Sequence, residues 1–113
     1  MIKIYHNPKC SKSRAGLKYL QDKGIDAEVI DYIKNPIPVG ELKDITKKLN
    51  IKPLDLIRKK EDIFVKEYKN KSLTDDEWLD VMVSNPRLIE RPVVVNGNKA
   101  VIARPTEKIE EIL

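Results

Sequence analysis

The start of the chain alternates between strand-like and helix-like periodicity, and this alternation constrains the fold more than any other feature. Apolar and polar side chains alternate over residues 2–6, as they do in a half-buried strand. Residues 11–23 then carry leucines at helical spacing and end before Gly24, a common helix stop, and residues 27–32 again have the composition of a strand. Two strands joined by one helix over so short a distance predict a right-handed βαβ unit with parallel strands.

The middle of the chain is expected to be helical. Thr74 is followed three residues later by Glu77, which is a capping box and predicts a helix that ends before Pro86. The lysines of segments 58–60 and 66–71 are expected to form a solvated face. The apolar positions expected in the core of this part are Leu42, Ile45, Leu49, Trp78, Leu79 and Met82.

The end of the chain returns to strands. Two β-rich runs within residues 93–103 flank the dipeptide Asn96-Gly97, which predicts a hairpin with a type I′ turn. A last short helix is expected from about Thr106. The order strand–helix–strand, helices, strand–strand–helix predicts a small α/β domain with a mixed four-stranded sheet.

Composition limits the classes to which the protein can belong. Its 113 residues are 41% hydrophobic and 35% charged, which is typical of one globular domain. We find no signal-peptide pattern and no apolar run of about 20 residues, so we expect a cytoplasmic protein with no membrane association. The net charge of +4, with acidic residues interspersed, argues against nucleic-acid binding. A single cysteine excludes an intramolecular disulfide and fits a reducing compartment.

That cysteine, Cys10, lies in the segment YHNPKCSKSR (5–14), where the first strand ends and the first helix begins. There its sulfur would face the positive end of the helix dipole, with Lys9, Lys12 and Arg14 nearby. We therefore expect a lowered thiol pKa and a nucleophilic thiolate. The backbone amides and serine hydroxyls of the same turn would also bind a tetrahedral oxyanion. The alternative is a buried, inert cysteine.

Arginine is used sparingly, because only five of the 22 basic residues are arginine. A guanidinium can donate two parallel hydrogen bonds to an oxyanion, whereas lysine acts as a point charge. We therefore expect oxyanion ligands among the arginines. These are Arg14, Arg58, Arg87, Arg91 and Arg104.

Four separated segments carry a family resemblance. They are HNPKCSKSR (6–14), LIRKK (56–60), IERPVVV (89–95) and ARPTE (103–107). Together they resemble the glutaredoxin-coupled bacterial arsenate reductases, which are related to the Spx-type transcription regulators. The resemblance implies a single thioredoxin-like domain over residues 1–113. Its three-layer α/β fold would have a mixed four-stranded sheet in the order 2-1-3-4, with a helical insertion between strands 2 and 3 at about residues 38–85.

The resemblance also implies a reaction and a site. Cys10 would be the nucleophile that attacks arsenate, and Arg58, Arg91 and Arg104 would surround the arsenic oxyanion. The Arg91–Pro92 bond matches the position at which thioredoxin-like folds carry a cis proline facing the active-site cysteine. Three of the five arginines thus fall on motif positions.

Three further residues near the cysteine have a supporting role or a purely structural one. His6 either tunes the thiolate or is a hydrogen-bonded residue at a strand end. Ser13 either donates a hydrogen bond to the thiolate or caps the helix. Arg14 either acts electrostatically or holds the loop, and Arg87, outside the motifs, is expected on the solvated surface.

The expected reaction is nucleophilic thiol catalysis on arsenate or a similar oxyanion. The Cys10 thiolate forms a covalent adduct with arsenic(V), and the electrons must come from outside because the chain has no second cysteine. The resemblance implies glutathione as co-substrate and glutaredoxin as the protein that completes reduction to arsenite. No metal or bound cofactor is expected, because one histidine and one cysteine make no ligand cluster. We expect a monomer.

Two other functions remain open. A glutathione-dependent thiol reductase without arsenate activity would use Cys10 equally well. A non-enzymatic, Spx-like regulator that binds RNA polymerase would leave Cys10 incidental, but the motif arginines argue against it. Ser13 also stands where Spx-type regulators often carry the second cysteine of a C-x-x-C switch.

Overall fold

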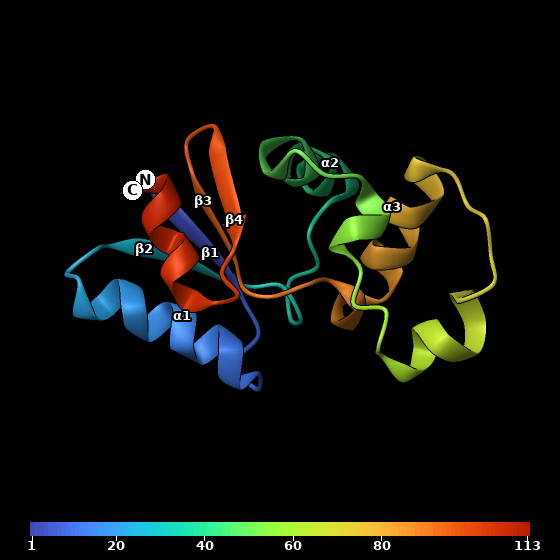
Figure 1. Ribbon diagram of the computed structural model, residues 1–113, viewed down its shortest axis with the longest axis horizontal. Helices are drawn as coiled ribbons and strands as arrows, with labels where there is room; N and C mark the ends of the chain where they lie inside the picture. Colours follow the sequence, from blue (N-terminus) through green and yellow to red (C-terminus); the bar gives the residue numbers. More distant parts are fainter. The chain divides into compact units, whose positions relative to one another are not determined.

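The structure, a computed structural model, describes residues 1–113 and divides into two compact units (Figure 1). The sheet unit consists of Met1–Asn35 and Arg91–Leu113 and holds all four strands. The helical unit, Pro36–Glu90, separates these two segments in the sequence. The helices expected between about residues 38 and 85 lie in the helical unit. None of the helices in either unit has the length and apolarity needed to cross a membrane.

The helical unit is organised around α3, Asp75–Ser84, which ends before Pro86 as expected. It contacts α2, Val39–Leu49, and the 3-10 helices η1, Pro53–Leu56, and η3, Pro86–Leu88. Five of the six expected core residues are buried, and Leu49, at the end of α2, is half-buried instead. The buried five are Leu42, Ile45, Trp78, Leu79 and Met82.

The capping box at the start of α3 is confirmed in both halves. The Thr74 hydroxyl accepts a hydrogen bond from the Glu77 N–H at 3.2 Å, and the Glu77 carboxylate accepts one from the Thr74 N–H at 2.9 Å. These bonds satisfy two backbone donors that have no partner within the helix. The box therefore fixes where α3 begins.

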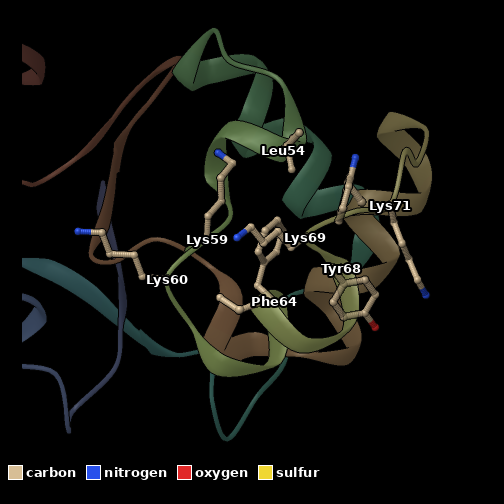
Figure 2. A pocket seen from close by; sticks show the side chains of 9 residues that line it. Leu54, Lys59, Lys60, Phe64, Tyr68, Lys69 and Lys71 are labelled. Carbon is tan, nitrogen blue, oxygen red and sulfur yellow. The ribbon is translucent and has the colours of Figure 1, made fainter.

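A π-helix, η2, occupies Phe64–Tyr68, and the sequence did not lead us to expect it. The Lys69 N–H donates to the Phe64 carbonyl, five residues back, at 2.8 Å. Phe64 stacks on Trp78 with ring centroids 6.0 Å apart, and Tyr68 meets the same indole edge-on at 6.3 Å. Figure 2 shows Phe64 and Tyr68 along this helix. Because Trp78 belongs to α3, the packing that accompanies the π-helix cannot be read from its local sequence.

The sheet unit begins with the βαβ arrangement that the sequence predicts. β1, Ile2–His6, is followed by α1, Ser11–Asp22, and β2, Ala27–Asp31, and the two strands pair in parallel. Gly24, the expected helix stop, has φ +69°, a conformation that favours glycine.

The hairpin completes a mixed sheet. β3, Val93–Asn96, pairs antiparallel with β1 on one side and with β4, Lys99–Ile102, on the other. The strand order is β2-β1-β3-β4, which confirms the α/β class and the expected order 2-1-3-4.

The hairpin turn differs from the expected one. Asn96 pairs with Lys99, so the two turn residues are Gly97 and Asn98 rather than Asn96-Gly97. Gly97 has φ +61° and Asn98 does not have a positive φ, which fits a type II′ turn and not type I′. Asn96 is held in the strand because its side-chain amide donates to the carbonyl of Ile112 at 2.6 Å. This tertiary bond moves the turn one residue along the chain.

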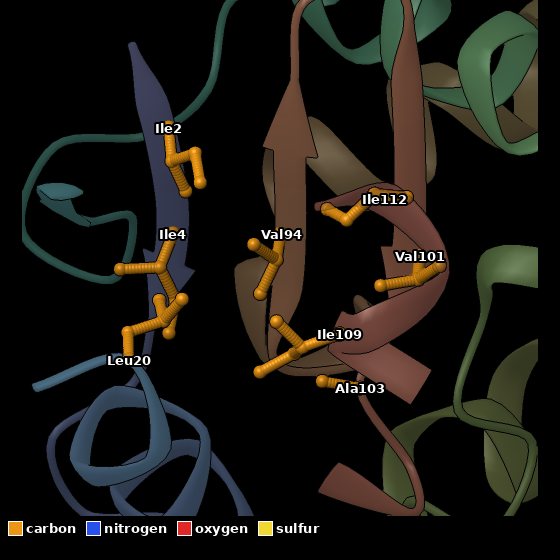
Figure 3. Packing of buried hydrophobic residues seen from close by; sticks show 8 residues of the cluster. All are labelled: Ile2, Ile4, Leu20, Val94, Val101, Ala103, Ile109 and Ile112. Carbon is orange, nitrogen blue, oxygen red and sulfur yellow. The ribbon is translucent and has the colours of Figure 1, made fainter. Parts of the chain in front are cut away.

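One face of the sheet packs against α1 and the 3-10 helix η4, Thr106–Ile112, which is the expected last helix (Figure 3). Side chains at alternate strand positions point to this face, and leucine and isoleucine side chains of the two helices meet them. The buried cluster consists of Ile2, Ile4, Leu20, Val94, Val101, Ala103, Ile109 and Ile112.

Gly16 allows α1 to lie directly against the start of the hairpin. A Cβ atom at Gly16 would stand 2.8 Å from Cγ of Pro92 and 3.7 Å from Cδ1 of Ile4. The first turns of α1 are therefore fixed against Pro92.

Candidate active site

The predicted site residues of the sheet unit gather at one edge of the sheet because of its register. β1 and β4 both run antiparallel to β3, so their carboxyl ends lie beside the start of β3. Arg91 and Pro92 immediately precede β3, and Arg104 follows β4 after one residue. Cys10 lies on the loop that leaves β1. The topology thus brings together groups from three separated motifs.

Cys10 is the N-cap residue of α1, with φ −95° and ψ 125°. Its carbonyl accepts the N–H of Arg14 at 3.0 Å, and its own N–H donates to the carbonyl of Asn7 at 3.0 Å. The backbone N–H groups of Lys12 and Ser13 donate to its sulfur. The first turn of the helix therefore surrounds the thiol with donors, as its place at the strand–helix junction predicts.

These donors make the thiol acidic. Burial raises the pKa of Cys10, but the N–H of Ser13, a hydrogen bond from the Arg91 guanidinium, the N–H of Lys12 and the charge of Arg91 together lower this pKa from 9.0 to about 7. A substantial fraction of the sulfur is therefore thiolate at neutral pH. The guanidinium that contacts it belongs to Arg91, and not to Arg14, the closest arginine in the sequence.

The loop before Cys10 is held by side chains at its two ends. The Asn7 side-chain oxygen accepts the N–H of Lys9 at 3.1 Å, and the Ser13 hydroxyl accepts the N–H of Asn7 at 2.9 Å. Asn7 was not singled out as a site residue, although Asn before proline is a typical turn signal. The Arg14 guanidinium donates to the carbonyl of Pro8 at 3.0 Å, which is the loop-holding geometry.

His6 is buried and bonded to Ser13, with Nδ1 2.6 Å from the hydroxyl oxygen. Burial lowers the pKa of His6, and the Asp31 charge and the Ser13 hydrogen bond only partly offset this. Burial at this position therefore favours the neutral imidazole. The Ser13 hydroxyl thus bonds His6 and Asn7, whereas the backbone N–H of Ser13 donates to the thiol.

The Arg91–Pro92 peptide bond is cis, as the resemblance implied. The Arg104–Pro105 bond is cis as well, and no motif predicted it. Arg104 is half-buried at the end of β4.

Arg58, the third motif arginine, belongs to the helical unit. Its Nε lies 3.6 Å from a carboxylate oxygen of Glu61 and 3.9 Å from one of Glu90. Arg87, in η3, is exposed, as expected for a residue outside the motifs.

Comparison with known proteins settles the family. Residues 5–112, nearly the whole chain, match the model of the ArsC family. The chain belongs to the ArsC family. It is 44% identical over 115 residues to a protein from Neisseria meningitidis serogroup A named arsenate reductase, covering 99% of this chain and 97% of that relative. It is also 41% identical over 114 residues to the uncharacterized protein YfgD of Escherichia coli K12, covering 99% and 96%.

A solved ArsC structure has the same fold. The arsenate reductase from Vibrio cholerae superimposes with a TM-score of 0.95 at 40% identity, covering 99% of this chain and 97% of that one. The family and the thioredoxin-like fold implied by the four motifs are thus confirmed.

Proposed function

We propose that this protein reduces arsenate to arsenite by nucleophilic attack of the Cys10 thiolate on arsenic(V). The observation that carries the proposal is the acidic thiol at the start of α1, in hydrogen-bond contact with the guanidinium of Arg91. A thiolate is the nucleophile that arsenic chemistry requires, and a pKa of about 7 supplies it at neutral pH. Membership of the ArsC family and relatives named arsenate reductase support the choice of substrate.

The site also suits an anion. In the free protein, the N–H groups of Lys12 and Ser13 and the Arg91 guanidinium point at the thiolate. When the sulfur attacks arsenic, the negative charge of the thiolate passes to the oxygens of the substrate. The same donors can then form hydrogen bonds to those oxygens. Hydroxide leaves arsenic with a proton, as water, and a sulfur–arsenic(V) bond remains.

Two electrons are then needed to convert arsenic(V) to arsenic(III). The chain holds a single cysteine, so two external thiols must supply them and end as a disulfide. We propose glutathione as the first thiol, which attacks the adduct, and glutaredoxin as the second, which removes glutathione as a mixed disulfide. Arsenite then leaves by hydrolysis and Cys10 is regenerated.

Arg104 and Arg58 are proposed as further oxyanion ligands. Arg104 leaves the sheet at the same edge as Arg91. Arg58 is paired with Glu61 and Glu90, so its guanidinium would have to bind the oxyanion with donors that these carboxylates leave available.

The test is arsenite production by purified protein with glutathione and glutaredoxin. Cys10→Ser should abolish it. Arg91→Lys keeps the charge but loses the planar pair of donors, so we expect at least about a 10-fold loss of rate. Arg87→Lys is the matched control, because Arg87 is exposed and outside the site.

Two results would redirect the assignment. If Arg91→Lys and Arg87→Lys were equally harmless, the guanidinium geometry would have no catalytic role. If wild-type protein reduced glutathione mixed disulfides but not arsenate, with both activities measured in one preparation, the thiol-reductase function would replace the proposed one.

A further inference from the structure

The helical unit has an open groove that does not involve Cys10 or the motif arginines. Its cavity volume is about 560 Å³, within the range of ligand-binding sites. Phe64, Tyr68 and Trp78 line it, and the π-helix places the first two rings against the third. Val65, which also lines the groove, is 48% exposed. Because Phe64 and Trp78 are themselves buried, the apolar surface open to an incoming side chain is that of Val65 and the half-buried Leu54 and Tyr68.

Lysines border the groove without any acidic neighbour in its lining. The lining includes Lys59, Lys60, Lys69 and Lys71, and none of the four forms an ion pair. The ammonium of Lys71 lies over the Tyr68 ring, 5.2 Å from its centroid. Lys60 points away from the rings (Figure 2). The other three amines form a positive rim around the apolar residues of the groove. This is a local excess of positive charge, because the chain as a whole carries 18 acidic residues and 22 basic ones.

We propose that this groove binds an acidic segment of a partner protein, with an aliphatic or aromatic side chain in the groove and carboxylates on Lys59, Lys69 and Lys71. The three lysines are exposed and form no ion pair within the chain, so the carboxylates of an acidic partner can pair with them. Apolar anchoring beside a charged rim is the usual arrangement of a protein-binding surface. The solvated lysine face expected from the sequence thus gains a function.

The rings favour a peptide over a single-stranded nucleic acid. Bases bind by stacking on exposed aromatic faces. Trp78 is only 3% exposed and Phe64 only 6%, so neither offers a free face. Tyr68 is half-buried, and the Lys71 ammonium lies over its ring.

The experiment uses the full chain and its own fluorescence. Trp78 is the only tryptophan and lines the groove, so its emission reports occupancy. The probe is a tryptophan-free peptide, acetyl-Asp-Glu-Leu-Phe-Glu-Glu-amide, and the charge control replaces its acids by Asn and Gln. We expect a saturable change in emission with the acidic peptide and none with the neutral one. No change up to about 1 mM acidic peptide would overturn the proposal.

Charge-reversal variants locate the binding. Lys71→Glu should lower the affinity for the acidic peptide about fivefold or more. Lys66→Glu changes the net charge equally, in the same segment, but Lys66 does not line the groove and should leave the affinity within about twofold. Equal losses of affinity in the two variants would mean that the peptide is attracted by net charge alone, which would overturn the proposal. Oligothymidine binding that is lost only in Lys71→Glu, without peptide binding, would replace the protein partner by a nucleic acid.

Discussion

Replacing Gly16 by alanine tests how α1 is docked against the sheet. The new Cβ would lie 2.8 Å from Cγ of Pro92, whereas ordinary carbon contacts lie at about 3.5–4.0 Å. Pro92 is fully buried and its ring cannot swing away, so α1 or the start of β3 must move. Overpacking of this kind lowers the free energy of unfolding by about 1–3 kcal/mol. The higher helix propensity of alanine offsets up to about 1 kcal/mol of this loss. We expect a net loss of about 1 kcal/mol in the free energy of unfolding.

The matched control is Gly40→Ala in α2. Nothing lies within 4 Å of a Cβ atom there, so only the helix-preference gain remains and the variant should be as stable as wild type or more so. Urea unfolding of the two variants gives the difference directly. Because Pro92 follows Arg91, displacement should also weaken the Arg91–Cys10 hydrogen bond and raise the pKa of the thiol above about 7. Equal stability of the two variants, with an unchanged thiol pKa, would refute the reasoning.

Two further predictions concern the thiol and the capping box. The rate of Cys10 alkylation should rise with pH to a midpoint of about 7, and a midpoint at or above 9.0 would remove the basis for the nucleophile. Because folding lowers this pKa, the contribution of the thiolate to stability is fully present above pH 9.0 and is lost as the pH falls through about 7, which a comparison with Cys10→Ser across that range measures. Thr74→Ala should cost about 0.5–2 kcal/mol in urea unfolding, while Ser72→Ala, also exposed but outside the box, should cost nearly nothing.

Local patterns were sufficient for the strands, the α-helices and the position of Cys10. Each depends on neighbours in the sequence: alternation in β1, a stop at Gly24, and the box at Thr74 and Glu77. The strand order came from the family resemblance instead, because periodicity alone does not say which strands pair.

Features that depend on distant residues were not predictable. The turn moved by one residue because Asn96 bonds to Ile112, and the π-helix accompanies packing on Trp78. Sequence proximity also favoured Arg14 as the electrostatic partner of Cys10, yet the fold brings Arg91 to the sulfur. The motif that contains Arg91 predicts that this residue binds the oxyanion. It did not predict the hydrogen bond from Arg91 to the sulfur of Cys10.

The groups that make Cys10 acidic, Lys12, Ser13 and Arg91, all belong to the sheet unit, whereas Arg58 belongs to the helical unit. The donors that lower the pKa of the thiol and the third arginine proposed as an oxyanion ligand thus lie in separate stretches of the chain. Substitutions within Pro36–Glu90 leave all of these donors to the sulfur unchanged in sequence. A lineage carrying this fold can therefore vary its helical unit without rebuilding the donors that make the thiol acidic.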